Sequence, residues 1–143
     1  MQVLFKARST SPDLLLTVKV NDNTVYSAQL DEEFKEIEFF MREIDGAYTL
    51  DFILSGKSPV KHTTVDSTGN IVHDEYIEIK DLIMDTVPVG QIWFDNTVYY
   101  HNYNGTGYDT ESDFFGTMGC NGTARFKFEC PFYMWYLETL TNQ

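Results

Sequence analysis

A chain of 143 residues can bury one sizeable hydrophobic core but not two, so we expect a single domain over residues 1–143. Hydrophobic residues make up 43% of the chain and aromatic residues 15%, which excludes a disordered chain. Acidic residues outnumber basic ones by 22 to 10, and the net charge of −12 repels phosphate groups and anionic lipids. The charge therefore argues against nucleic acid and membranes as partners.

The N-terminal segment carries Lys6 and Arg8 where the apolar region of a secretion signal would continue. No apolar stretch reaches the roughly 20 residues that a membrane span needs. We therefore expect a protein that is made and folds in a cytoplasm. Such a compartment favours reduced thiols at Cys120 and Cys130 over a bridge between them.

Alternating hydrophobic and polar residues predict strands in the first half of the chain. A first strand is expected around residues 2–6. Residues 14–20 and 24–30 are typical of a hairpin, because the turn Asn21-Asp22-Asn23 tolerates a left-handed backbone. The 31–45 segment is ambiguous between helix and strand, and its alternation favours a strand. Residues 48–54 alternate cleanly and predict a further strand.

A long polar segment, residues 57–75, then carries a turn at 66–70, and such segments hold a small hairpin or a functional loop. Strands are expected again at 76–84 and 123–129. The tail, residues 131–137, is too apolar to hang free and should dock as a short helix or meet another subunit. Together these elements predict an all-β fold: a two-sheet antiparallel β-sandwich, jelly-roll-like, with long loops and a short docked C-terminal segment.

The histidines give little sign of catalysis. His62, His73 and His101 lie near no recognisable nucleophile motif, so we expect a protein that is not an enzyme. A small enzyme that uses His62 or His101 is the third-ranked alternative.

Metal binding is only weakly indicated. Asp66 and Asp74 lie in the 57–75 segment and carry oxygens that calcium accepts. The regular acidic series of calcium loops and the ligand spacing of zinc sites are both missing. An exposed hairpin tip explains the segment better, so no cofactor is expected, with Ca²⁺ as the alternative.

Aromatic residues concentrate between Trp93 and Phe115, among many Asn, Gly, Thr and Asp. Tyr and Trp stack on sugar rings while amides and carboxylates bond to sugar hydroxyls, and the same residue types are enriched at protein interfaces. The alternative is that Trp93 and its phenylalanine neighbours are core and only the tyrosines are exposed. With the apolar tail, the candidate binding surface consists of Trp93, Tyr99, Tyr100, Tyr103, Tyr108, Phe132, Tyr133 and Trp135.

The first 85 residues resemble small jelly-roll carbohydrate-binding modules of the xylan-binding type. The resemblance is carried by Val20-Asn21-Asp22, which is similar to the turn after their second strand, and by Tyr76-Ile77-Glu78-Ile79, which is similar to the strand after their calcium loop. It implies a sugar-binding jelly roll. The 57–75 segment departs from the pattern, because it lacks the close acidic cluster that such modules use for calcium.

A second resemblance covers nearly the whole chain. The segments 65–72, 101–107, 118–123 and 131–135 resemble uncharacterised virion-associated proteins of tailed phages, notably those that infect marine cyanobacteria. It implies a virion protein made in the host cytoplasm, with a structural or host-recognition role.

Two functions follow as hypotheses. The first is a non-enzymatic virion accessory protein, such as a capsid decoration, tail or fibre subunit, whose partners are other virion proteins or further copies of itself. The alternative is a carbohydrate-binding module that recognises a host surface glycan.

Overall fold

The computed structural model describes residues 1–142 and consists of two antiparallel sheets and a small third one. The strands of the first sheet are β1 (Gln2–Ser9), β4 (Lys35–Phe40), β8 (Ile77–Met84), β9 (Val87–Pro88) and β12 (Thr117–Met118). Those of the second are β2 (Leu15–Val20), β3 (Asn23–Gln29), β5 (Gly46–Ser55), β10 (Thr97–His101), β11 (Thr110–Asp113) and β13 (Gly122–Cys130). The third sheet pairs β6 (Thr63–Val65) with β7 (Ile71–Asp74), and the helices are α1 (Pro59–His62), α2 (Gln91–Asp95) and α3 (Phe132–Thr141).

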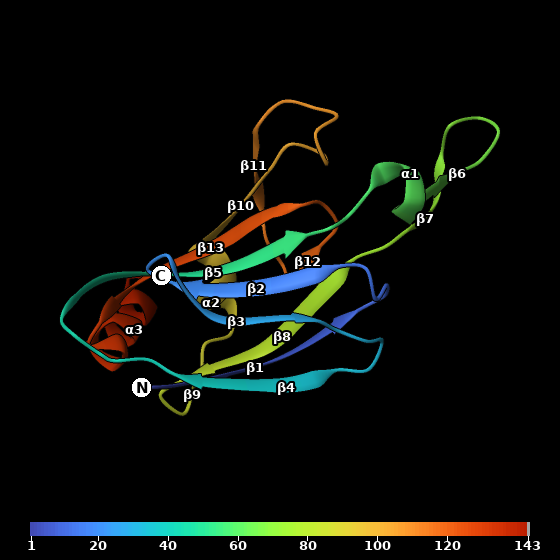
Figure 1. Cartoon of the computed structure of the whole chain (residues 1–143). Helices are drawn as coiled ribbons and strands as arrows, with labels where there is room; N and C mark the ends of the chain where they lie inside the picture. Colours follow the sequence, from blue (N-terminus) through green and yellow to red (C-terminus); the bar gives the residue numbers. More distant parts are fainter. Residues whose placement is uncertain (143) are drawn as a thin grey trace.

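The two larger sheets form the layers of a sandwich (Figure 1). Strands follow the order β12-β8-β1-β4 in the first sheet, where β9 also pairs with β8, and β11-β10-β13-β5-β2-β3 in the second. The β2–β3 hairpin turns at Asn21 and Asp22, both at positive φ, as their residue types predict. The expected all-β sandwich is confirmed.

The core lies between the layers, because successive side chains of a strand point to opposite faces. Val3, Phe5 and Ala7 of β1 are buried, and the intervening residues face outward. From the opposite layer the ring of Phe52 meets that of Phe5 edge to face at 5.2 Å. The alternation seen in the sequence is thus the in-and-out pattern of two packed sheets.

In three segments the structure defines the elements more closely than the sequence does. The 31–45 segment is a strand only over β4. The polar segment 57–75 contains the hairpin β6–β7, as expected. The apolar tail forms the short helix α3. It docks through the fully buried Phe132, whose ring centroid lies 5.8 Å from that of Phe128.

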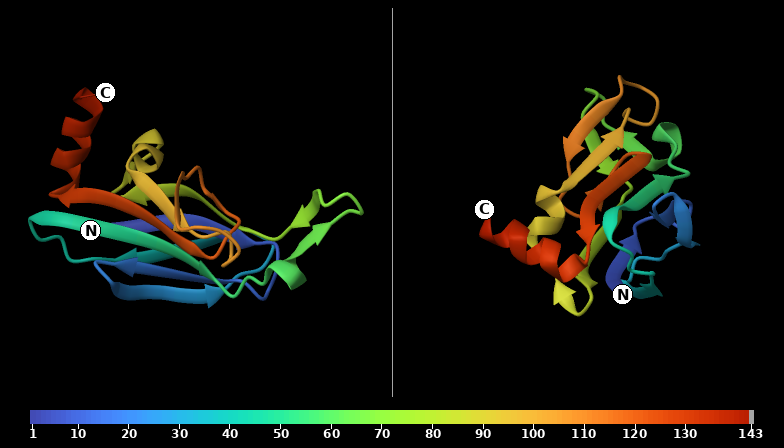
Figure 2. Two further views of the ribbon diagram at one scale, coloured as in Figure 1. Left: turned by 90° about the horizontal axis from the view of Figure 1, so that it is seen from above. Right: turned by 90° about the vertical axis from the view of Figure 1, so that its left-hand side faces the viewer.

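Helix α3 and the hairpin β6–β7 lie at opposite ends of the sandwich, as the views in Figures 1 and 2 agree. The hairpin projects beyond the sheets, close to the end where β10 and β11 also extend. Among residues 1–142 there is no helix whose length and apolar character would let it cross a membrane.

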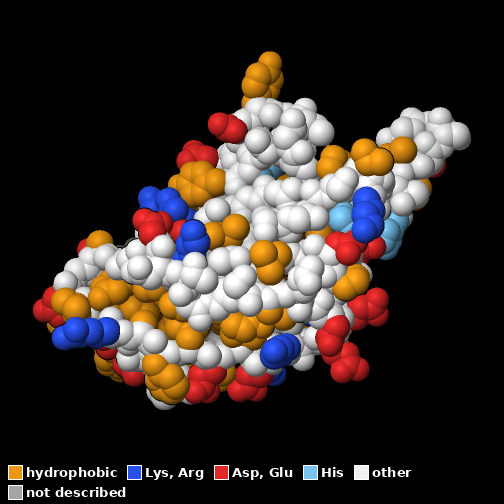
Figure 3. All heavy atoms as spheres, in the orientation of Figure 1, with side chains coloured by type: hydrophobic (Ala, Val, Ile, Leu, Met, Phe, Trp, Pro, Cys, Tyr) orange, Lys and Arg blue, Asp and Glu red, His pale blue; other side chains and the backbone are white. Residues whose placement is uncertain are grey.

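The acidic side chains are unevenly placed on the face seen in Figure 3. They gather along the edge that β4 forms, while the projecting part around β10 and β11 shows mostly uncharged groups. On this face most acidic side chains therefore lie on the body of the sandwich.

Candidate functional site

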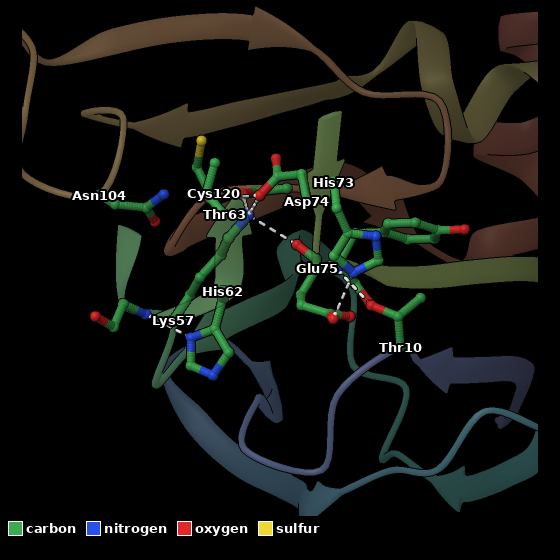
Figure 4. A network of polar contacts seen from close by, with 12 residues as sticks. Thr10, Lys57, His62, Thr63, His73, Asp74, Glu75, Asn104 and Cys120 are labelled. Carbon is green, nitrogen blue, oxygen red and sulfur yellow. Dashed lines mark hydrogen bonds and ion pairs between the residues drawn. The ribbon is translucent and has the colours of Figure 1, made fainter. Parts of the chain in front are cut away.

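The segments 56–75, 102–109 and 118–122 come together at the end of the sandwich remote from α3, and we call them the loop end. They meet because β5 and β13, which pair along their whole length, deliver the chain to the same place at Ser55 and Gly122. Long-range hydrogen bonds then join the segments to one another, as the close-up in Figure 4 shows.

Lys57 is the centre of this arrangement. Its side chain is 1% exposed, and its Nζ donates to Asp74 Oδ1, to the Glu75 carbonyl oxygen at 2.7 Å and to the Gly119 carbonyl oxygen (Figure 4). An ammonium group has three N–H donors, so each of them has an acceptor. The hydroxyl of Thr63 donates to the same Asp74 oxygen at 2.7 Å.

Asn121 fastens the backbone of Lys57. Its Oδ1 accepts from the Lys57 N–H at 2.9 Å, and its Nδ2 donates to the Lys57 carbonyl oxygen at 2.7 Å. The backbone N–H of Asn121 donates to Asn104 Oδ1 at 2.7 Å. One side chain and one backbone amide thereby tie together all three segments of the loop end.

Tyr99 supports the 118–122 segment from below. Its hydroxyl donates to the Cys120 carbonyl oxygen and accepts from the Cys120 N–H at 2.9 Å. Burial raises the pKa of the Tyr99 phenol, so it stays a donor at physiological pH. Burial also raises the pKa of Cys120, and the thiols of Cys120 and Cys130 are both free.

His62 fixes the base of the hairpin. Its Nδ1 accepts from the Ser58 N–H at 2.8 Å, so the ring proton lies on Nε2, which donates to Asp13 Oδ2 at 3.0 Å. Lys61 contacts the same carboxylate at 2.7 Å, and hydrogen bonds from both side chains lower the pKa of Asp13. The other candidate base, His101, contacts Ser112 Oγ at 2.9 Å and packs against the ring of Tyr103.

A groove of about 670 Å³ opens beside the loop end, on strands β10, β11 and β13. Its lining consists of Tyr100, His101, Asn102, Asp109, Thr110, Glu111, Asn121 and Gly122. Tyr100 is the aromatic ring of the lining, and Tyr103 adjoins it, because its ring contacts the lining His101 with centroids 4.7 Å apart. Tyr108 precedes the lining Asp109 in the chain and is 94% exposed. Flat aromatic rings thus stand next to carboxylates and amides. A side chain at Gly122 would meet the Tyr100 carbonyl oxygen, so glycine is required there.

A second groove, of about 680 Å³, lies along β8 and α2. It is more apolar than the first, and its aromatic members are Phe5, Trp93, Phe94 and the exposed Phe115; the rings of the last two are 6.1 Å apart. Two of its three carboxylates are paired, Glu78 with Arg8 and Asp81 with Lys6, and the third is that of Glu36. This groove therefore suits a more apolar ligand than the first groove does.

The sequence-predicted binding surface does not form as one surface. Trp93, Tyr99 and Phe132 are buried, so they were wrong as contact residues; Trp93, for example, packs on Phe52 in the core. Tyr100, Tyr103 and Tyr108 lie at the groove or beside it. The remaining candidates lie at the other end of the sandwich on α3, where Tyr133 is exposed and Trp135 is half-buried.

The two aspartates proposed for a metal lie in different surroundings. Asp66 Oδ1 accepts from the Thr68 hydroxyl and from the Thr68 and Asn70 N–H groups, and these bonds lower its pKa. Asp74 holds the Lys57 ammonium instead. Across the described residues 1–142, no group of three or more His, Cys, Asp or Glu is placed to hold a metal ion. Asp66 and Asp74 therefore do not form one common site.

Lys57 and Asn121 were not predicted from the sequence as residues of a site. A lysine after a strand and an asparagine before a glycine are ordinary in polar loops, and their contact spans 64 residues. No local pattern marks such a pair.

Comparison with known proteins gives the fold. No family model matches the chain, and no curated protein matches it. Among solved structures it is similar to vCBM60 in complex with galactobiose, with a TM-score of 0.55, 13% identity and coverage of 88% of this chain and 97% of that one. It is also similar to the selenomethionine form of vCBM60, which is described within a circular-permutation link between two families of calcium-dependent carbohydrate-binding modules. There the TM-score is 0.54, the identity 14%, and the coverage 87% and 88%.

The likeness to a jelly-roll carbohydrate-binding module is thus confirmed at the level of the fold. The resemblance to phage proteins is tested by none of these comparisons and stays a prediction.

Proposed function

We propose that this chain is a non-catalytic carbohydrate-binding module that holds a glycan in the groove beside its loop end. Two lines of support converge. The fold is that of vCBM60, which was solved with galactobiose. On this fold, a groove lined with Tyr100, Asp109 and Glu111 lies beside the exposed Tyr103, and the exposed Tyr108 precedes Asp109 in the chain. The composition of this groove carries the proposal, because its aromatic rings and carboxylates are the groups that bind sugars.

A sugar presents two kinds of surface, and the groove matches both. Its C–H faces stack on flat aromatic rings, which bury apolar area at little entropic cost. Its hydroxyls donate to carboxylates, and Asp109 and Glu111 offer two of them in the groove. Ligand sites commonly combine apolar walls with a few placed polar groups in this way.

The charge of the groove narrows the ligand class. Among the described residues that line it are two carboxylates and no lysine or arginine. A glycan that carries carboxylate or sulfate groups would be repelled. The groove therefore favours neutral sugars, in keeping with the overall charge of −12.

A glycan array followed by titration calorimetry tests the proposal. Tyr108→Ala should weaken binding of a neutral glycan about tenfold or more, the equivalent of ~1.4 kcal/mol. Tyr133→Ala is the matched control, because Tyr133 is an exposed tyrosine at the far end and should leave affinity unchanged. A blank array would refute the function.

The array also discriminates between the two grooves. Phe115 is exposed and belongs to the groove along β8. If Phe115→Ala abolished binding while Tyr108→Ala did not, the glycan site would have to be moved to that groove.

The virion-subunit hypothesis stays a second candidate, favoured by one observation. Met134, Leu137 and Leu140 of α3 are exposed, although they are large and apolar. Such side chains are enriched where proteins associate. If α3 joins copies of the chain or binds other virion proteins, Met134→Lys with Leu137→Lys should abolish self-association in analytical ultracentrifugation. Mass spectrometry of virions would establish whether the chain is a component.

A further inference from the structure

Three oxygens of the loop end converge on one point. They are Asp74 Oδ1 and the carbonyl oxygens of Glu75 and Gly119, and we call them the cation cradle. A carboxylate together with backbone carbonyls is a donor set that proteins use for hard cations. In this chain the point of convergence is filled by the Lys57 Nζ (Figure 4).

We propose that the Lys57 ammonium is a built-in cation of the loop end, and that the cradle accepts an ammonium group and not a metal ion. This inference rests on the proposed function in one respect: glycan binding by this chain should not depend on calcium. It thereby separates the chain from the calcium-dependent modules with which it shares a fold.

The number and kind of donors favour an ammonium group. Calcium takes six to eight oxygens and magnesium takes six, so water would have to add to the three oxygens of the cradle. The Lys57 side chain that fills the cradle is 1% exposed, so this site is closed to water. Three acceptors match three N–H donors. The Thr63 hydroxyl donates to the cradle oxygen of Asp74 and occupies a lone pair that a metal would need. The Glu75 carboxylate is not among the three cradle oxygens, and its Oε1 contacts His73 Nε2 at 2.7 Å.

Lys57 is held in place at both ends, by its backbone and by its Nζ. Asn121 bonds both its backbone N–H and its carbonyl oxygen, and its side chain is 1% exposed. A lysine loses much rotamer freedom when it is buried, and here the backbone anchors fix the point from which the side chain starts. The ammonium is therefore preorganised in the cradle.

The cradle positions the glycan groove through a chain of direct contacts. The ammonium joins the base of the hairpin β6–β7 to Gly119. Two residues later Asn121 lines the groove and bonds Asn104 in the 102–109 segment, which carries both exposed tyrosines. Lys57 is in this sense a positioning residue, which does not itself line the groove.

Thermal unfolding of the full chain tests the inference. The melting temperature of the wild type should be the same with calcium chloride, with magnesium chloride and with EDTA. Lys57→Ala should lower it by roughly 10 °C, because a charge partner in a buried network is lost. Millimolar propylammonium, which restores the missing ammonium, should recover part of that loss, whereas calcium should not. Lys35→Ala, at an exposed lysine of β4, is the control and should be neutral and unaffected by propylammonium.

Several results would overturn the inference. They are a calcium-dependent rise in the melting temperature of the wild type, a fall with EDTA, or a Lys57→Ala variant rescued by calcium and not by propylammonium. Should Lys57→Ala not fold, Lys57→Met keeps most of the apolar stem and removes the ammonium while Asp74 stays a carboxylate, and calcium must not raise the melting temperature of this variant. These readouts need no glycan, so a failure of the proposed function would leave them interpretable.

Discussion

The body of the sandwich and the loop end are stabilised by different means. In the body, side chains such as Phe5 and Phe52 contact one another through apolar surface, and the contribution of each grows with the area it buries. In the loop end, Lys57 and Asn121 hold the chain through directed hydrogen bonds between segments far apart in sequence. Apolar packing tolerates small shifts, whereas a buried polar network loses much of its worth when one member is removed. The binding end thus depends on a few polar residues, and the body depends on many apolar ones.

The largest effect is expected from the body. Phe52 is fully buried between Phe5 and Trp93, so Phe52→Ala should lower the free energy of unfolding by about 3–5 kcal/mol. Urea unfolding followed by tryptophan fluorescence measures this loss, and it should be the same at pH 5 and pH 7, since no charge is involved. Phe40→Ala, at a 70% exposed ring, serves as the control. If Phe52→Ala lowered the free energy of unfolding no more than Phe40→Ala, the body would not be stabilised by its apolar contacts as described.

An intermediate effect is expected from Asn121. Asn121→Ala leaves the N–H and carbonyl groups of the buried Lys57 backbone without their partner, at a cost of about 1–3 kcal/mol. Hydrogen exchange should show the loss concentrated in the loop end, with the amides of β13 beyond Ala124 still protected. Uniform loss of protection over β5 and β13 would instead mean that the two regions unfold as one.

The smallest effect is expected from acid at the hairpin β6–β7. Hydrogen bonds lower the pKa of Asp66 below its ordinary 3.8, and those from Thr10 and His73 lower the pKa of Glu75 below 4.5. Because the unfolded chain binds protons more readily at these groups, their contribution is complete above about pH 4.5 and is lost as pH falls further. Protection factors of Ile71 to Asp74 should therefore fall below pH 4, ahead of those in β5.

Asp66→Asn provides the control for the acid experiment. The amide oxygen still accepts the hydrogen bonds of the turn but does not titrate. The variant should keep the hairpin and lose the share of the pH response that Asp66 contributes. An unchanged response would assign the effect to Glu75 or to Asp13, whose pKa is also lowered.

The difference between the body and the loop end also explains which features could be predicted from the sequence. The strands of the body were predictable, because alternation is a local signal and the residues that share a face lie two apart. Trp93 was misplaced because composition identifies an aromatic segment without saying which rings face inward. Lys57 was not identified, since its partner Gly119 lies 62 residues away and joins it only after β5 and β13 have paired. The exposure of Tyr103 and Tyr108 was predictable, because turn-rich segments with tyrosines are typical of exposed loops.

The cradle also holds together the two ends of a loop of the chain. It joins Lys57 to Asp74 and Glu75, which are the two stems of the projecting arm. The path between these stems, residues 58–73, forms a loop whose ends stay together whatever lies between them, and loop-closure cost rises only slowly with length. Such an arm can be lengthened, trimmed or exchanged without disturbing the sheets, which makes it a natural place for this molecule to acquire a new appendage. Replacing residues 66–70 with a longer flexible insert should leave the melting temperature within a few degrees of the wild type.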